Sequence, residues 1–132
     1  MKIERPESKL KRPKHAKRVF QGVIFDVWQW EQKMFDGSTK IYEQLTRPDT
    51  VNVIPVTSDK KIIITHQEQS GLGSFIGMPG GIIDPGEDPL TAAKRELEEE
   101  TGYTSDKWKL WESVQLAGKL DSPVYGFLLG DN

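Results

Sequence analysis

Three glutamates near the end of a predicted helix are the residues in this sequence best suited to chemistry. Glu96, Glu99 and Glu100 stand at the spacing i, i+3, i+4 and therefore share one face of a helix. Their repulsion costs roughly 0.2–0.5 kcal/mol per pair, and the helix dipole favours cations at this end. Arg95 alone does not balance three acids. A solvated acidic face is one interpretation. The other is a site for Mg²⁺, Mn²⁺ or Ca²⁺, which prefer clustered carboxylate oxygens.

The helix that carries these glutamates has clear predicted limits. Asp88 is a good N-cap residue, and the proline after it suits the first helical position. Gly102 is the expected C′ residue that ends the helix. Leu90, Ala93 and Leu97 fall on one face, which we expect to pack on a core. A loop rich in glycine and proline, residues 78–88, leads into the helix.

The order of residues from Gly81 to Tyr103 resembles the Nudix box, G-x5-E-x7-R-E-U-x-E-E-x-G-U, in which U is hydrophobic. All nine specified places are filled, by Gly81, Glu87, Arg95, Glu96, Leu97, Glu99, Glu100, Gly102 and Tyr103. A chance match of this length is negligible. The chain is therefore identified as a member of the Nudix hydrolase family, and it looks most like the branch that cleaves ADP-ribose and nucleotide sugars.

The resemblance implies a metal-dependent pyrophosphohydrolase that cleaves the diphosphate linkage of a nucleoside diphosphate derivative. Metal ions neutralise phosphate oxygens, activate water and hold the reactants in line. Carried over from the family, Glu96 and Glu100 are the principal ligands of Mg²⁺ (or Mn²⁺), and Glu99 is a further ligand. The backbone carbonyl of Gly80 completes the site, and Arg95 orients Glu99. Structural roles in the box are expected for Gly81, Glu87 and Gly102.

Four further residues are candidate substrate contacts. Trp28 and Trp30 are able to stack on an adenine base, although packing in a core or a dimer interface is the stronger alternative. Arg47 is a candidate phosphate contact, with an ordinary strand-edge role as its alternative. Gln69 stands where the ADP-ribose branch often has a phosphate-binding arginine. His66 ends an apolar strand and is expected to be a hydrogen-bonded side chain and not a catalyst.

The rest of the chain predicts an α+β protein with an antiparallel or mixed sheet. The alternation of apolar residues, or a short apolar run, indicates strands at residues 19–30, 39–46, 51–56, 61–66, 108–116 and 124–129. We expect residues 61–66 to form a central strand and residues 67–77 a polar loop. The resemblance implies the Nudix fold, a mixed sheet sandwiched between helices, with the box as loop–helix–loop. It also implies a homodimer built through the N-terminal strands.

Composition and charge are those of an ordinary globular protein. The 132 residues carry a net charge of −2 and no cysteine, which excludes disulfides and fits a reducing cytoplasm. No apolar run has the length of a membrane span. Residues 1–18 hold eight Lys or Arg against two Glu, and we expect a flexible or loosely docked basic arm there. This arm offers a contact for nucleic acid, but a solubilising tail is the favoured interpretation.

Residues 19–132 are expected to form one Nudix domain that lacks part of the usual C-terminal region, because only 29 residues follow Tyr103. No general base is assigned, since none of the acids after the box stands in a recognisable motif. Two other functions stay open. The chain is either a hydrolase of (oxidised) nucleoside triphosphates or an inactive Nudix module that binds nucleotide or RNA.

Overall fold

The structure, a computed structural model, describes residues 1–130 and divides them into two compact units. The first, here called the helix unit, contains Asp49–Ser113 and the chain from Val124. The second, the ribbon unit, contains Lys2–Pro48 and Val114–Pro123. The strands β8 (Trp108–Ala117) and β9 (Leu120–Leu129) run through both. Residues 2–18 belong to the ribbon unit together with the first three strands. The expectation of one domain over residues 19–132 stays a prediction.

The helix unit is built on a mixed sheet. β4 (Thr50–Pro55) pairs in parallel with β9 and antiparallel with β7 (Gly80–Ile82), while β8 pairs with β9. Side chains alternate along β4 and β9, so that one face of the sheet is buried and the other is half-buried or exposed. The buried face is lined by Val51, Val53, Pro55, Tyr125, Phe127 and Leu129.

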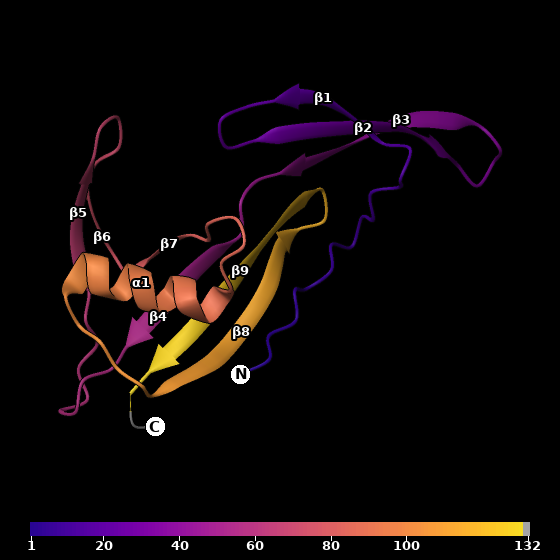
Figure 1. Cartoon of the computed structure of the whole chain (residues 1–132). Coiled ribbons are helices and arrows are strands. Elements are labelled where there is room, and N and C mark those ends of the chain that lie inside the picture. Colours follow the sequence, from indigo (N-terminus) through magenta and orange to yellow (C-terminus); the bar gives the residue numbers. More distant parts are fainter. Residues whose placement is uncertain (131–132) are drawn as a thin grey trace. The chain divides into compact units, whose positions relative to one another are not determined.

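The helix α1 (Pro89–Thr101) supplies the apolar partner of that sheet, in contact with β4 and β7 (Figure 1). Its buried residues are Ala92, Ala93 and Leu97. Both predicted ends are confirmed. The Asp88 side chain accepts a hydrogen bond from the backbone N–H of Thr91 at 3.0 Å, and Gly102 adopts the left-handed conformation with φ 77°. The cap and the apolar stripe therefore fix where the acidic face of the helix lies.

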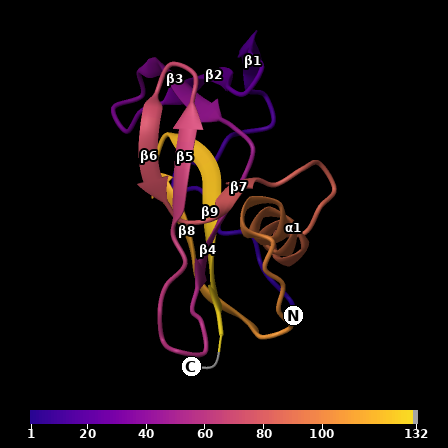
Figure 2. The same cartoon turned by 90° about the vertical axis from the view of Figure 1, so that its left-hand side faces the viewer.

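The expected central strand over residues 61–66 is wrong. Residues 61–64 make only one isolated bridge, Val56 with Ile62, and Ile62 and Ile64 are half exposed. The chain instead forms a separate hairpin from β5 (Thr65–Gln69) and β6 (Gly73–Gly77), shown in pink in Figure 2. The predicted polar loop over residues 67–77 is also wrong, because most of these residues belong to the two strands of the hairpin. Gly71 and Gly73, both with positive φ, allow the tight turn between the strands.

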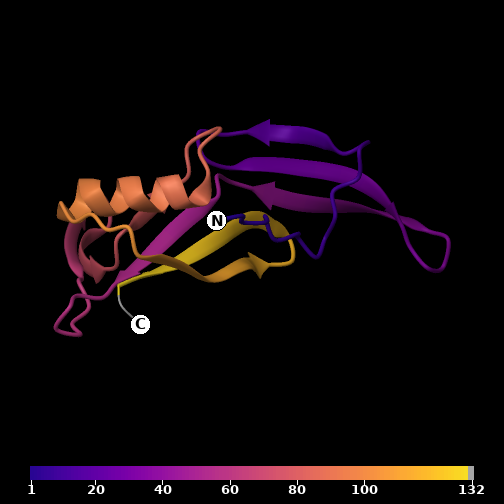
Figure 3. The same ribbon diagram turned by 60° about the horizontal axis from the view of Figure 1, so that its bottom comes forward.

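The ribbon unit contains three antiparallel strands, β1 (Lys17–Gln21), β2 (Asp26–Lys33) and β3 (Thr39–Thr46) (Figure 3). The predicted strand over residues 19–30 is divided in two, because Gly22 closes a turn by donating its N–H to the carbonyl of Phe25 at 2.8 Å. The predicted hairpin partner at 39–46 is confirmed as β3. The end of β3 then pairs in parallel with the start of β9.

The basic arm makes hydrogen bonds with the rest of the ribbon unit, which agrees with the docked alternative of the two that its composition left open. Gln44 is 1% exposed and donates to the carbonyl of Leu10 at 2.7 Å, while its own oxygen accepts from Arg12 at 2.8 Å. Arg5 pairs with Asp121 at 2.9 Å. The buried amide of Gln44 therefore holds the arm in place. If the arm moved away, this amide would lose its hydrogen-bond partners and remain unsatisfied in a buried position.

The second helical layer implied by the resemblance is not found, since α1 is the only α-helix within residues 1–130. Within residues 1–130, the sheet of the helix unit therefore has a helix on one face, packed against β4 and β7. No helix in the described part of the chain has the length and apolar character that crossing a membrane requires.

Candidate active site at the glycine strand and the acidic helix

Arg95 is the centre of the hydrogen-bond network that joins α1 to the loop before it. Its guanidinium donates twice to the Glu87 carboxylate, at 2.8 Å from Nε and from Nη2, and once to the carbonyl of Ile82 at 3.1 Å. The Glu87 carboxylate also accepts the N–H of Asp84 at 3.1 Å. These bonds fix the loop on the helix, so that the glycine strand β7 lies beside the glutamates.

This network also sets the charge on Glu87. The hydrogen bonds from Arg95 hold the pKa of Glu87 below its usual range. Asp84 lies 3.6 Å from Arg95 as a further acidic partner. Sequence reasoning missed Asp84 and the carbonyl of Ile82, because neither place is specified in the box. The only sequence signal was their position in the loop between Gly81 and Glu87.

The three glutamates of the helix are placed differently. Glu96 is 12% exposed, accepts from Arg95 at 2.9 Å and lies so close to Gly81 that a Cβ there would be 2.4 Å from its Oε1. Glu100 accepts the backbone N–H of Gly80 at 3.0 Å. Glu99 is 59% exposed and only 3.5 Å from Arg95 at its nearest atom. Two glutamates therefore contact consecutive glycines of β7, and the third is turned towards Arg95.

Glu100 carries the electrostatic signature of an unbalanced site. Partial burial raises its pKa, and the neighbouring charges of Glu96 and Glu99 raise it further, while the hydrogen bond from Gly80 acts in the opposite direction. A divalent cation would relieve the repulsion and favour the ionised form. Across residues 1–130, however, no three His, Cys, Asp or Glu side chains are gathered around one point in the way an ion requires. The exposed Glu99 side chain would have to turn away from Arg95 to join the other two.

The carbonyl of Gly80 is directed to the edge of the sheet on which Glu100 lies. The N–H of Val53 takes the carbonyl of Pro79 at 2.9 Å, and Gly81 is in register with Val51. Because peptide groups alternate in direction along a strand, both groups of the intervening Gly80 point away from β4. Its N–H meets Glu100, and its carbonyl faces the same edge. The chemistry of this donor set, carboxylates with a backbone oxygen, suits a hard cation.

The candidate substrate contacts are dispersed. In the ribbon unit, Trp30 is 3% exposed and packs edge-on against Tyr42, whereas Trp28 carries the Arg12 guanidinium over its ring at 4.3 Å. Both observations favour the packing alternative for these tryptophans. Arg47 lies over the ring of Phe25 at 5.7 Å, and its Nε is buried without a hydrogen-bond partner.

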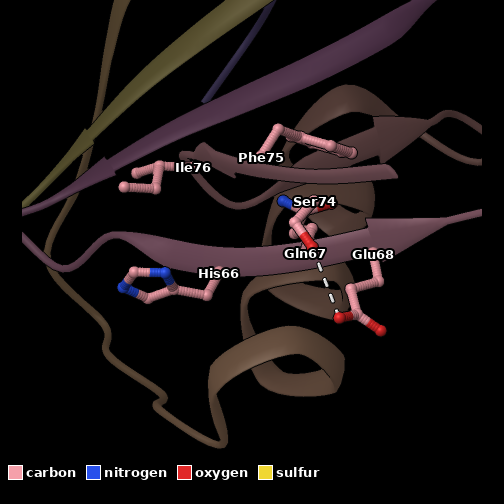
Figure 4. A pocket seen from close by; sticks show the side chains of 6 residues that line it. All are labelled: His66, Gln67, Glu68, Ser74, Phe75 and Ile76. Carbon is pink, nitrogen blue, oxygen red and sulfur yellow. Dashed lines mark hydrogen bonds between the residues drawn. The ribbon is translucent and has the colours of Figure 1, made fainter. Parts of the chain in front are cut away.

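Gln69 and His66 lie on the hairpin of the helix unit. Gln69 is exposed and pairs with Gly73 next to the turn. His66 is exposed and lines a surface pocket of about 610 Å³ together with residues from both strands (Figure 4). Across this hairpin, the hydroxyl of Ser74 donates to Glu68 at 3.3 Å. His66 therefore does not end a buried strand as its sequence context predicts.

The fold and this loop–helix arrangement agree with the family that the Gly81–Tyr103 motif resembles, and comparison with known proteins gives the same family. The family model described as the NUDIX domain matches residues 46–125. The chain belongs to this family.

Two curated relatives are similar over much of the chain. An ADP-ribose pyrophosphatase of Bacillus subtilis is 34% identical over 113 residues, which cover 84% of this chain and 61% of that protein. A methanol dehydrogenase activator of Bacillus methanolicus is 34% identical over 93 residues, which cover 70% of this chain and 50% of that protein. The chain thus spans between half and two thirds of the length of these relatives.

A solved structure confirms the fold. The crystal structure of an ADP compounds hydrolase aligns with a TM-score of 0.72 and 22% sequence identity, covering 98% of this chain and 69% of that one. At this level of identity the likeness shows the shared fold.

Proposed function

We propose that this chain hydrolyses the diphosphate linkage of a nucleoside diphosphate derivative, with ADP-ribose or a nucleotide sugar as substrate. The observation that carries the proposal is the pair of contacts at β7, where Glu96 lies against Gly81 and Glu100 accepts from Gly80. The name of the Bacillus subtilis relative supports ADP-ribose as the first substrate to test. The products would be a nucleoside monophosphate and a phosphorylated sugar.

Mg²⁺ or Mn²⁺ is the proposed cofactor, held by Glu96, Glu100 and, after its side chain turns, Glu99, with the Gly80 carbonyl. When bound, such an ion neutralises phosphate oxygens and lowers the pKa of a bound water. The chain's own contribution is positional. Arg95 holds the loop and Glu96 in place, and Glu100 is held against the Gly80 N–H, so that the acceptor atoms lie at one edge of the sheet.

Arg47 is proposed as a contact for a substrate phosphate. Its Nε is buried with no partner in the described residues, and an unpaired donor in such a place is costly unless a ligand satisfies it. An arginine also suits a phosphate group through its fork of donors. Arg47→Lys keeps the charge but loses the fork, and we expect it to raise KM for ADP-ribose while circular dichroism stays unchanged.

A homodimer through the N-terminal strands is the proposed assembly. β1 is exposed along its whole length, and it is followed by an exposed apolar turn. Unpaired strand edges and clustered apolar side chains are surfaces that proteins use for association. The exposed apolar residues are Val19, Phe20, Val23, Ile24 and Phe25. Val23→Lys should shift the mass measured by light scattering to that of a monomer, whereas Phe35→Lys, on the β2–β3 turn, should not.

Turnover of ADP-ribose with Mg²⁺ or Mn²⁺ tests the proposed activity. We expect cleavage that EDTA abolishes and that Glu100→Gln reduces by a factor of about 100 or more, since a metal ligand is lost. Glu98→Gln is the matched control, because Glu98 is exposed on the same helix and its side chain makes no hydrogen bond or ion pair with any residue in the range 1–130. Release of pyrophosphate from nucleoside triphosphates in preference to ADP-ribose cleavage would contradict the proposed substrate. Absence of any turnover with metal bound would contradict the activity itself.

A further inference from the structure

The ribbon unit has a pocket of about 540 Å³ that the functions proposed above do not use. This volume lies within the range of roughly 300–1,000 Å³ that is usual for small-molecule sites. Its residues come from the end of the arm and from β1, β2 and β3. Directly paired residues of neighbouring strands share a face, so most of the lining stands on one face of the ribbon. The paired lining residues are Lys17 with Gln29, Glu31 with Ile41, and Lys33 with Thr39.

The arm is anchored on the opposite face of these strands. Gln44, which holds the arm, pairs with Trp28, and both alternate along their strands with the residues of the pocket. The Arg12 guanidinium lies over the Trp28 ring on that same opposite face. The pocket itself is open to solvent, since its apolar residues Val19 and Ile41 are 51% and 60% exposed.

Two lysines of the pocket have no acidic partner. The ammonium groups of Lys17 and Lys33 make no hydrogen bond or ion pair with any residue in the range 1–130. On the opposite face, by contrast, Arg12 and Arg18 are each paired with an aspartate, at 4.0 and 3.4 Å. Two lysines against the single acid Glu31 leave the pocket positive in a chain whose net charge is −2. An anionic group is therefore attracted to this face of the ribbon.

The remaining lining suits a ring that carries hydrogen-bond donors. Val19 and Ile41 offer an apolar floor. Gln29 donates its Nε2 to Glu43 at 2.8 Å, which fixes the amide with its Oε1 as an acceptor. The Glu31 carboxylate is a second acceptor, with no partner among residues 1–130. Glu31 would repel a simple anion, and an apolar molecule would leave the lysines unmatched, so the lining favours a ring with N–H donors joined to one anionic group.

We propose that this pocket of the ribbon unit binds a nucleoside monophosphate. The base lies on the apolar floor and donates its N–H groups to Gln29 and Glu31. The flexible stems of Lys17 and Lys33 allow both ammonium groups to turn to the phosphate. None of these residues belongs to the Gly81–Tyr103 motif, so the site does not depend on the proposed hydrolysis.

Calorimetric titration of the full chain with AMP, adenosine and inorganic phosphate tests the proposal. The titrations are made in EDTA, which removes any metal-dependent binding at the glutamates of α1. We expect saturable binding of one AMP per chain. Adenosine and phosphate should each bind at least about tenfold more weakly, because each lacks one of the two parts that the pocket recognises, and a charge-assisted hydrogen bond alone contributes about this factor.

Matched variants locate the binding in the pocket. Lys17→Gln/Lys33→Gln should weaken AMP binding about tenfold or more and leave adenosine binding unchanged. Lys40→Gln/Lys119→Gln removes the same charge from two exposed lysines outside the pocket and should bind AMP as the wild type does. Lys17→Arg/Lys33→Arg keeps the charge and should restore binding, which separates lost contacts from lost folding. Ile41→Glu places an acid in the floor and should abolish AMP binding.

Four results would overturn the proposal. They are the absence of AMP binding, phosphate binding as tight as that of AMP, AMP binding that the pocket variants leave unchanged, and equal weakening by the control pair of lysines. If AMP does not bind and Ile41→Glu converts a dimer to a monomer in light scattering, the pocket is an interface between two copies of the chain. Turnover of ADP-ribose is measured separately, and its presence or absence leaves this test unaffected.

Discussion

Gly81→Ala is the sharpest test of how the loop positions Glu96. A Cβ at residue 81 would lie 2.4, 2.6 and 2.9 Å from the Oε1, Cδ and Oε2 atoms of Glu96. Ordinary contacts begin near 3.4 Å, so the carboxylate must move by about 1 Å. No backbone atom is among these contacts, which means that the side chain of Glu96 can yield while the strand stays in place.

The expected effects on stability and on activity therefore differ in size. Moving Glu96 disrupts its bond with Arg95, a loss of about 1.5–3 kcal/mol at most for a hydrogen bond to a charged group. A misplacement of about 1 Å in a catalytic group, by contrast, lowers the rate about 100-fold. We expect Gly81→Ala to remain folded, with a modest loss of unfolding free energy, and to lose most of its Mg²⁺-dependent turnover.

The assay combines urea unfolding with turnover of ADP-ribose, with Gly118→Ala as the glycine control, because a Cβ there would meet nothing within 4 Å. Glu96→Asp shortens the side chain, so the double variant Gly81→Ala/Glu96→Asp should be more stable than the sum of the single changes predicts. Full activity in Gly81→Ala, or strict additivity in this cycle, would refute the reasoning that the close approach of Gly81 and Glu96 positions the carboxylate.

Three other outcomes are expected. Gly80→Ala should lower the free energy of unfolding by about 2–4 kcal/mol in urea, which is more than Gly81→Ala, because its Cβ would meet the Val51 carbonyl oxygen at 2.4 Å. A loss equal to or smaller than that of Gly81→Ala would contradict this backbone clash. Arg95 lowers the pKa of Glu87 in the folded protein. The pairing therefore contributes fully to the free energy of unfolding above the unfolded pKa of Glu87, near 4.5, and this contribution is lost as the pH falls through the lower folded pKa. The stability difference between wild type and Glu87→Gln should shrink over that range, and a constant difference would contradict the pairing. Gln44→Leu should release the arm at a cost of about 1–3 kcal/mol, seen as faster trypsin cleavage at the arm lysines; unchanged cleavage would show that other contacts hold it.

Local rules determined the helix and its chemistry. The cap at Asp88, the left-handed Gly102 and the apolar stripe with Leu97 are short-range features, so their positions followed from residue types and spacing alone. The same was true of the hairpin partner at 39–46, whose turn is closed by neighbouring residues. The family membership also followed from sequence, because the box is a run of specified residues.

Long-range contacts decided the rest. Residues 61–64 are apolar enough for a central strand, yet they contribute one bridge, because pairing depends on which strands lie alongside and not on apolar character. Composition left a flexible and a loosely docked arm as alternatives, and the docked arm depends on contacts with the buried Gln44, which is 32 residues from Arg12. Lys17 and Ile41 are 24 residues apart in the sequence and line one pocket only because β1 and β3 both pair with β2. Spacing along a chain determines one face of one helix, whereas a site shared by several strands exists only once the sheet has formed.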